Sequence, residues 1–270
     1  MCASEGSPTG TVVYEPFDPA PSFHLAAAGD IGDSGARLDA TAAAIAAIGG
    51  TAPYDALLLL GDNVYPAGEP ARLPATVFEP FGAVLDQGTA LYAILGNHDV
   101  KEGHGPAQME ALGLPGRWWS QRFGDVLLIG LDSNTPDDEH QLQFLERTLA
   151  ESDATWKIVA LHHPPYSAGY QGSDHAARDA FTPSFERYGV QLVLSGHDHD
   201  YQRSDPLDGV VYVVSGGGAG TRRTGKADFT AVSFSWHHFL DIGVFPDRLV
   251  LRAVNQDLRV ADELVLRARA

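Results

Sequence analysis

The chain has a single cysteine, Cys2, among 270 residues, so no disulfide bond can form within it. Long hydrophobic runs are also lacking, because no apolar stretch approaches the roughly 18 residues of a membrane-spanning helix. Basic residues are scarce: 18 Lys and Arg stand against 35 Asp and Glu, which gives a formal net charge of -17. A field of this sign repels nucleic acid and anionic membranes, so we expect neither as a partner. The negative charge does not exclude a small anionic substrate, since bound metal ions can reverse the sign of the potential inside a cleft.

The rest of the composition is that of a globular protein, with 44% hydrophobic and 20% charged residues. A chain of this length can bury roughly three quarters of its unfolded surface, which excludes disorder along the whole chain. No repeat and no internal linker divides the sequence. We therefore expect a flexible N-terminal tether over residues 1–20 and a single domain over residues 21–270.

Cys2 is followed by the small and polar residues 3–10, which resemble a linker. One interpretation is an ordinary N-terminal segment. The other is a lipid anchor at Cys2, as in an exported lipoprotein whose signal peptide has been cleaved. The second interpretation predicts an extracytoplasmic location at a membrane surface, without an integral membrane span.

Short apolar runs, four to six residues long and rich in Val, Leu, Ile and Ala, predict buried strands. They lie at 24–28, 56–60, 91–95, 126–131, 157–161, 190–194 and 210–214. Helical periodicity separates several of them, at 36–48, 140–149 and 181–188, and the tail predicts strands at 237–244, 248–254 and 262–267. Alternating strands and helices followed by consecutive strands indicate an α/β fold, with a mixed sheet and a second sheet packed on it.

Nearly every apolar run ends in a polar cluster. Because functional residues of open α/β sheets gather outside the carboxyl ends of the strands, these clusters should converge on one edge. The converging side chains are two carboxylates, an amide and three imidazoles: Asp30, Asp62, Asn97, His162, His197 and His199. This donor set suits iron, zinc or manganese better than calcium, and it is too large for one tetrahedral zinc. The sequence therefore predicts a centre with two metal ions.

Five ordered motifs give the chain a family resemblance. They are Gly29-Asp30-x-Gly32, Gly61-Asp62-Asn63, Gly96-Asn97-His98-Asp99, His162-x-Pro164 and Gly196-His197-x-His199. In this order they resemble the calcineurin-like metallophosphoesterases, and most of all the small purple acid phosphatases. Most members of the superfamily carry a histidine where this chain has Gly32. Purple acid phosphatases instead place a tyrosine three positions after the second aspartate, as Tyr65 stands after Asp62 here.

The resemblance implies a four-layer α/β/β/α sandwich of two mixed sheets flanked by helices. It also implies that one metal is held by Asp30, Tyr65 and His199, a second by Asn97, His162 and His197, and that Asp62 bridges them. The tyrosine site would hold Fe(III), and the second site Fe(II), Zn(II) or Mn(II). A phenolate is a hard anionic donor, which agrees with a trivalent ion at the first site.

The activity implied is hydrolysis of phosphate monoesters by an acid phosphatase-like enzyme, with a metal-bound hydroxide as nucleophile. His98 would protonate the leaving group or stabilise the phosphate, with Asp99 orienting His98 or its backbone. His163 and His175 are further catalytic candidates that could contact a small phosphorylated substrate. The alternatives are a phosphodiesterase or nucleotide hydrolase of the same superfamily, and a non-catalytic surface protein that binds metal or phosphate.

Two further patterns invite other interpretations. Residues 220–226 almost match a phosphate-binding P-loop, but Ala227 stands where Ser or Thr is required and no helical pattern follows. We interpret this segment as a surface turn from which Arg222 or Arg223 could reach a substrate. His237 and His238 are neighbours in an expected strand and point to opposite faces, so we interpret them as structural.

Overall fold

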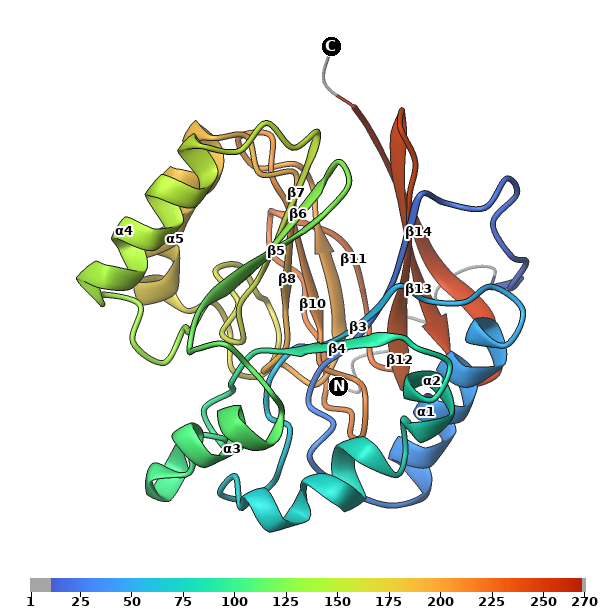
Figure 1. The fold of residues 1–270 in the computed structure, drawn as a ribbon. Coiled ribbons are helices and arrows are strands. Elements are labelled where there is room, and N and C mark those ends of the chain that lie inside the picture. Colours follow the sequence, from blue (N-terminus) through green and yellow to red (C-terminus); the bar gives the residue numbers. More distant parts are fainter. Residues whose placement is uncertain (1–10, 269–270) are drawn as a thin grey trace, which may run out of the picture.

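Two mixed β-sheets pack face to face, and helices cover their outer surfaces (Figure 1). The computed structural model describes residues 11–268, and within this range each sheet has seven strands. This is the four-layer α/β/β/α sandwich that the sequence predicts.

The first sheet has the strand order β1-β14-β13-β12-β2-β3-β4. Its strands β2, β3 and β4 run parallel, and the other neighbours are antiparallel. The bounds are β1 (Val12–Val13), β2 (Phe23–Ala28), β3 (Ala56–Leu59), β4 (Ala90–Ala93), β12 (His238–Val244), β13 (Arg248–Asn255) and β14 (Arg259–Arg267).

The second sheet has the order β11-β9-β10-β8-β7-β6-β5. Strands β6, β7, β8 and β10 are parallel, and the edges are antiparallel. The bounds are β5 (Trp119–Phe123), β6 (Val126–Gly130), β7 (Trp156–Ala160), β8 (Leu192–Ser195), β9 (Tyr201–Ser204), β10 (Val211–Ser215) and β11 (Thr230–Phe234).

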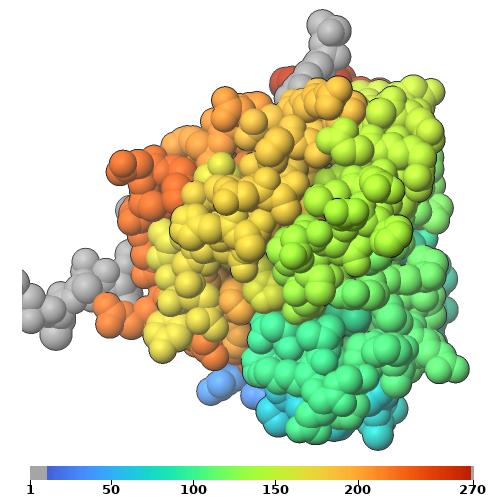
Figure 2. Space-filling model, turned by 90° about the vertical axis from the view of Figure 1, so that its left-hand side faces the viewer, coloured from blue at the N-terminus to red at the C-terminus, as the bar shows by residue number. Residues whose placement is uncertain are grey.

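Helices α1 and α2 lie beside the first sheet, whereas α4 and α5 cover the outer face of the second (Figures 1 and 2). The helices are α1 (Ala36–Gly49), α2 (Gly82–Leu85), α3 (Gly105–Ala111), α4 (Glu139–Ala150) and α5 (His175–Arg187), with short turns η1 (Pro70–Arg72), η2 (Pro74–Phe78) and η3 (Lys101–Gly103). Helix α5 begins earlier than expected because Asp174 caps it, accepting a hydrogen bond from the backbone N–H of Ala177 at 2.7 Å.

Side chains from alternate positions of the central strands fill two different layers. In β3, Leu58 packs into the core between the sheets, whereas Leu57 and Leu59 pack into the layer under α1. Both faces of these strands are thus buried, which explains their continuous apolar runs. Trp119 ties the sheets together, since its indole Nε1 donates to the carbonyl of Ala93 on β4 at 2.9 Å.

The described part of the expected tether contacts the rest of the protein. Strand β1 pairs with β14, and the ring of Phe17 lies 5.6 Å from that of His24 and 5.9 Å from that of Phe245. Contacts with the sheets therefore begin before residue 21. Cys2 lies outside the described residues, so its lipid anchor stays a prediction. Among residues 11–268 no helix is long and apolar enough to cross a membrane.

Candidate metal centre

The predicted metal ligands come from both sheets and follow the carboxyl ends of parallel strands. Asp30 follows β2, Asp62 and Tyr65 follow β3, and Asn97 follows β4. His162 follows β7, and His197 and His199 follow β8. The sandwich thus brings residues separated by more than a hundred positions to one edge, as the strand-end argument predicts.

The first group of donors consists of Asp30, Tyr65 and His199. The phenolic oxygen of Tyr65 lies 3.0 Å from Asp30 Oδ1 and 3.1 Å from His199 Nε2. His199 Nε2 is 3.3 Å from the same carboxylate oxygen. Asp30 is fully buried, and its second oxygen accepts the backbone N–H of His197 at 2.8 Å, which fixes the carboxylate.

The second group is centred on His162, which is also fully buried. Its Nδ1 lies 2.8 Å from the carbonyl oxygen of Leu60 and donates to it. Its Nε2 lies 3.2 Å from Asn97 Oδ1 and 3.4 Å from Asp62 Oδ1. Burial opposes a charge on this ring, but the carboxylates of Asp62 and Asp30 outweigh it and raise the pKa of His162 to about 10. These acceptors thus stabilise positive charge at Nε2, where a metal ion would replace the proton.

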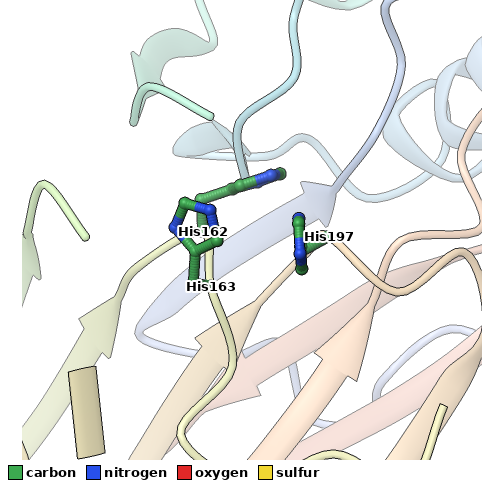
Figure 3. Close-up of side chains that lie close together, drawn as sticks. All are labelled: His162, His163 and His197. Atoms are coloured by element: carbon green, nitrogen blue, oxygen red, sulfur yellow. The ribbon is translucent and has the colours of Figure 1, made fainter. Parts of the chain in front are cut away.

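Ring nitrogens and carboxylate oxygens form two overlapping clusters with metal-binding geometry. Asp30, Asp62 and His162 offer ligand atoms that all lie within 4.8 Å of one another, and so do His162, His163 and His197. Figure 3 shows the three histidine rings gathered where the strands end. His162 belongs to both clusters, so the two candidate positions for a cation adjoin each other.

Several ligand candidates adopt strained backbone conformations. Asp30, Asp62 and His197 have φ angles of 57°, 52° and 71°, in the left-handed region that non-glycine residues rarely occupy. Such strain persists only where the surroundings enforce it, and it concentrates at functional sites. Its presence at three ligand candidates supports a functional role for this edge.

Two glycines permit the close approach of these loops. A Cβ on Gly96 would lie 2.1 Å from Asp62 Oδ1, so no side chain fits there. A Cβ on Gly32 would lie 2.7 Å from the backbone nitrogen of Tyr65, which donates to the Gly32 carbonyl at 3.0 Å. The histidine that most of the superfamily carries at this position is therefore incompatible with Tyr65 in its present place.

The electrostatics of the site favour a bound cation. Burial, followed by the carboxylates of Asp30 and Asp62, raises the pKa of Tyr65 far above its usual value of about 10. The protein alone thus keeps the phenol neutral. Burial also opposes ionisation of Asp62, but the adjacent His162 outweighs it and lowers the pKa of that carboxyl.

His163 and His197 are kept neutral. Burial and the neighbouring His162 lower the pKa of each to about 3. A neutral imidazole is the form that binds metal or donates one hydrogen bond. The hydroxyl of Ser133 lies 2.8 Å from His163 Nδ1 and accepts the backbone N–H of the same residue at 2.9 Å. This contact favours a proton on Nε2 of His163, which suits donation to a phosphate oxygen.

His98 lies beside the predicted metal ligands. Its Nδ1 donates to the Pro66 carbonyl at 2.6 Å, and its Nε2 lies 4.0 Å from Asp62 Oδ2. Lys101 Nζ lies 2.9 Å from Nδ1 and 3.3 Å from Nε2 of the same ring.

His175 lies apart from the other predicted site residues. It is the exposed first residue of α5, and within residues 11–268 no hydrogen bond or ring contact joins it to them.

Asp99 acts on the backbone of the loops around His98. Its buried carboxylate accepts the backbone N–H groups of Asn63, Val64 and Gly96 at 2.8–3.1 Å and the side chain of Gln108 at 3.0 Å. It therefore clamps the loops of the second and third motifs together. None of these bonds reaches the ring of His98, so Asp99 positions the backbone of the loop that carries it, the second of the two expected roles.

A cavity of about 350 Å³ opens next to the first donor group. It is lined by Tyr65, His98 and His199 together with Asp33, Pro66, Arg72, Gly220 and Arg222. The turn at 220–226 therefore borders the site through Arg222, and no helix follows it, which agrees with its interpretation as a surface turn. His238 is buried between Ser215 and Trp236, away from this cavity.

Comparisons with known proteins identify the family. The model of the calcineurin-like phosphoesterase family matches residues 23–201, more than half of the chain. The chain belongs to this family, as its motifs predicted.

Among its relatives are acid phosphatases. It is 29% identical over 197 residues to the tartrate-resistant acid phosphatase type 5 of Oryctolagus cuniculus, a match that covers 60% of each chain. The matched part thus spans less than two thirds of that relative. A purple acid phosphatase from yellow lupin seeds superposes with a TM-score of 0.77 at 18% identity, covering 92% of this chain and 55% of the other. GAP50, described as the anchor in the inner membrane complex of Plasmodium, superposes with a TM-score of 0.79 at 17% identity, covering 92% and 89%.

Proposed function

We propose that the protein hydrolyses phosphate monoesters with a dinuclear metal centre of the purple acid phosphatase type. The observation that carries the proposal is the position of the Tyr65 hydroxyl between Asp30 and His199. Gly32 leaves room for the backbone that carries Tyr65. The similarity to tartrate-resistant acid phosphatase supports it.

The donors fit two ions of different character. Asp30, Tyr65 and His199 would hold the first ion, for which Fe(III) is the proposed occupant, because only a strongly charged cation stabilises a phenolate that burial disfavours. Asn97, His162 and His197 would hold the second, as Fe(II), Zn(II) or Mn(II). Asp62 offers its carboxylate to both sites. When bound, such a pair of ions polarises the phosphoryl group and supplies a hydroxide nucleophile near neutral pH.

The side chains around the donors have separate tasks. The Nδ1 of His98 is engaged by the Pro66 carbonyl, and the ring lines the cavity. In its imidazolium form it would pass the proton on Nε2 to the departing alkoxide. His163 can donate from Nε2 to a phosphate oxygen. Ser133 holds that ring, and Asp99 holds the loop that carries His98.

The test is metal-dependent turnover. The chain reconstituted with iron and zinc should release phosphate from phenyl phosphate, and chelation of the metals should abolish the release. Diphenyl phosphate distinguishes a phosphomonoesterase from a phosphodiesterase, because a phosphodiesterase would hydrolyse this diester at least as fast as phenyl phosphate.

A non-catalytic binding protein would release no phosphate from either ester although both ions are bound. GAP50, which shares the fold, is described as an anchor. Because similarity at this level of identity shows the fold alone, a turnover measurement has to decide between catalysis and binding. The intact donor set supports catalysis.

A further inference from the structure

The cavity beside the first donor group contains two arginines in a strongly acidic chain. Arg72 and Arg222 both line it, and within residues 11–268 neither forms an ion pair with a carboxylate. Most other arginines of the described chain do pair with acids, for example Arg117 with Asp132 at 2.6 Å. Two unpaired guanidinium groups at the proposed active site are a feature that the hydrolysis of a simple ester does not require.

Arg72 is half-buried at the end of η1. One of its terminal nitrogens donates to the carbonyl oxygen of Tyr65, directly beside the proposed iron ligand. A guanidinium group has five N–H donors, so this bond orients Arg72 and leaves most of its donors for a ligand.

Arg222 is held at the cavity by hydrogen bonds of its backbone. Its N–H donates to the carbonyl of His199 at 2.7 Å, and its carbonyl accepts the hydroxyl of Ser235. Its guanidinium carbon lies 5.4 Å from the centre of the Tyr170 ring, within range of a cation–π contact.

Tyr170 is 72% exposed, which is unusual for a large aromatic side chain, yet its loop is anchored. The buried carboxylate of Asp198 accepts the backbone N–H of Gln171 at 2.7 Å and that of Gly172 at 3.2 Å. The anchored loop thus places this ring next to Arg222, which lines the cavity.

We propose that Arg72 and Arg222 bind a second anionic group on the leaving group of the substrate, which is therefore a phosphate monoester that also carries a carboxylate or another phosphate. This inference rests on the proposed phosphomonoesterase function. The transferred phosphoryl group would lie on the ions held by buried donors, whereas Arg222 is exposed at the cavity mouth, where the leaving group extends. Guanidinium groups bind carboxylate and phosphate through paired, charge-assisted hydrogen bonds.

Asp33 also lines the cavity and opposes an anion. Its single negative charge offsets only one of the two guanidinium charges. The three side chains together remain positive, which favours an anionic leaving group over a neutral or cationic one.

Three substrates that share one ring test the inference: phenyl phosphate, 4-carboxyphenyl phosphate and 1,4-phenylene bisphosphate. The wild type should show a lower KM for the two that carry a second anion. Arg222→Gln should raise their KM about tenfold more than it raises that of phenyl phosphate, as expected for a lost charge-assisted contact of about 1.4 kcal/mol. Arg72→Gln should act in the same direction, and Arg72→Lys should restore part of the loss.

Arg223→Gln is the matched control, because it removes the same positive charge from an exposed arginine that does not line the cavity. It should leave all three KM values unchanged. Tyr170→Phe should keep the preference for the anionic substrates, whereas Tyr170→Ala should weaken it by freeing Arg222. Equal losses on all three substrates in Arg222→Gln would overturn the inference and assign the arginine to the transferred phosphoryl group.

A binding experiment separates this inference from the proposed function. The metal-loaded protein is titrated calorimetrically with methylphosphonate and with methylenediphosphonate, which differ by one anionic group and need no turnover. Tighter binding of the diphosphonate that is lost in Arg222→Gln supports the second-anion site, even if no ester is hydrolysed. Equal affinities for the two probes in the wild type would contradict it, even if phenyl phosphate is hydrolysed.

Discussion

The phenolic oxygen of Tyr65 lies 3.1 Å from Nε2 of His199, although 134 positions separate the two residues. Burial and nearby carboxylates hold this phenol neutral, so a phenolate can form only on a highly charged cation. We expect the iron-loaded protein to be pink to purple through phenolate-to-Fe(III) charge transfer. Tyr65→Phe should bleach this absorption, as a visible spectrum at matched iron content will show.

Tyr92→Phe is the control for this experiment, since Tyr92 is half-buried and packs on Trp119 away from the site. Its spectrum should equal that of the wild type. A visible band that persists in Tyr65→Phe would show that another residue is the anionic donor, and the proposed subfamily chemistry would be wrong.

Asp62 is predicted to hold both ions. Its Oδ1 lies 3.4 Å from His162 Nε2, and the backbone N–H of His98 donates to the same oxygen at 2.9 Å. Asp62→Asn keeps the shape but removes the shared negative charge. Loss of a residue that merely orients a ligand lowers metal affinity roughly 10–100-fold, so this change should cost at least that much and lower turnover with it.

Metal content per chain, measured by elemental analysis beside phosphate release, checks this prediction. The exposed Asp86 provides the matched control, Asp86→Asn, which should retain both ions. Two ions and full turnover in Asp62→Asn would contradict the bridging assignment.

His98 is predicted to act on the leaving group without binding metal. His98→Ala should retain both ions and lose about 10²–10⁴-fold in kcat, the usual contribution of a positioned acid. The loss should be smaller for nitrophenyl phosphate than for an alkyl phosphate, because nitrophenolate departs without a proton. If the two esters lose the same factor, His98 only stabilises charge.

The residues that the sequence located correctly share one physical property. Asp30, Asp62 and His162 follow strands whose two faces are both buried. The sequence of such a strand is an unbroken apolar run, which is easy to recognise. Parallel strands in two stacked sheets then place these ends at a common edge. The strand ends and the motif order were therefore enough to predict the fold and the gathering of the donors.

Two of the strands that the sequence missed are polar. Strand β9 (Tyr201–Ser204) carries glutamine and arginine, and edge strand β5 carries Ser120, Gln121 and Arg122 at mostly exposed positions, so neither forms an apolar run. The clamp by Asp99 depends on contacts between distant loops, and so does the choice of Arg222 over Arg223 as the residue that lines the cavity. No local pattern encodes such contacts.

His238, the first residue of β12, links the stability of the protein to pH. The residue is fully buried, its Nδ1 donates to the Trp236 carbonyl at 2.8 Å, and its Nε2 accepts the hydroxyl of Ser215 at 3.0 Å. The neutral ring thus has both nitrogens satisfied and no place for a second proton. Burial lowers the pKa of His238 to about 4, against about 6.5 in the unfolded chain.

Because the unfolded chain then takes up the proton first, the contribution of His238 to stability is complete above pH 6.5 and is lost as the pH falls toward 4. The shift corresponds to about 3 kcal/mol of unfolding free energy. Urea unfolding of the metal-loaded wild type and of His238→Gln, measured from pH 7.5 to 4.5, isolates this contribution, since loss of metal at low pH affects both proteins alike. The wild type should be the more stable at pH 7.5, and its advantage should shrink steadily below pH 6.5. An advantage that stays constant across this range would show that the buried imidazole does not titrate between the two states.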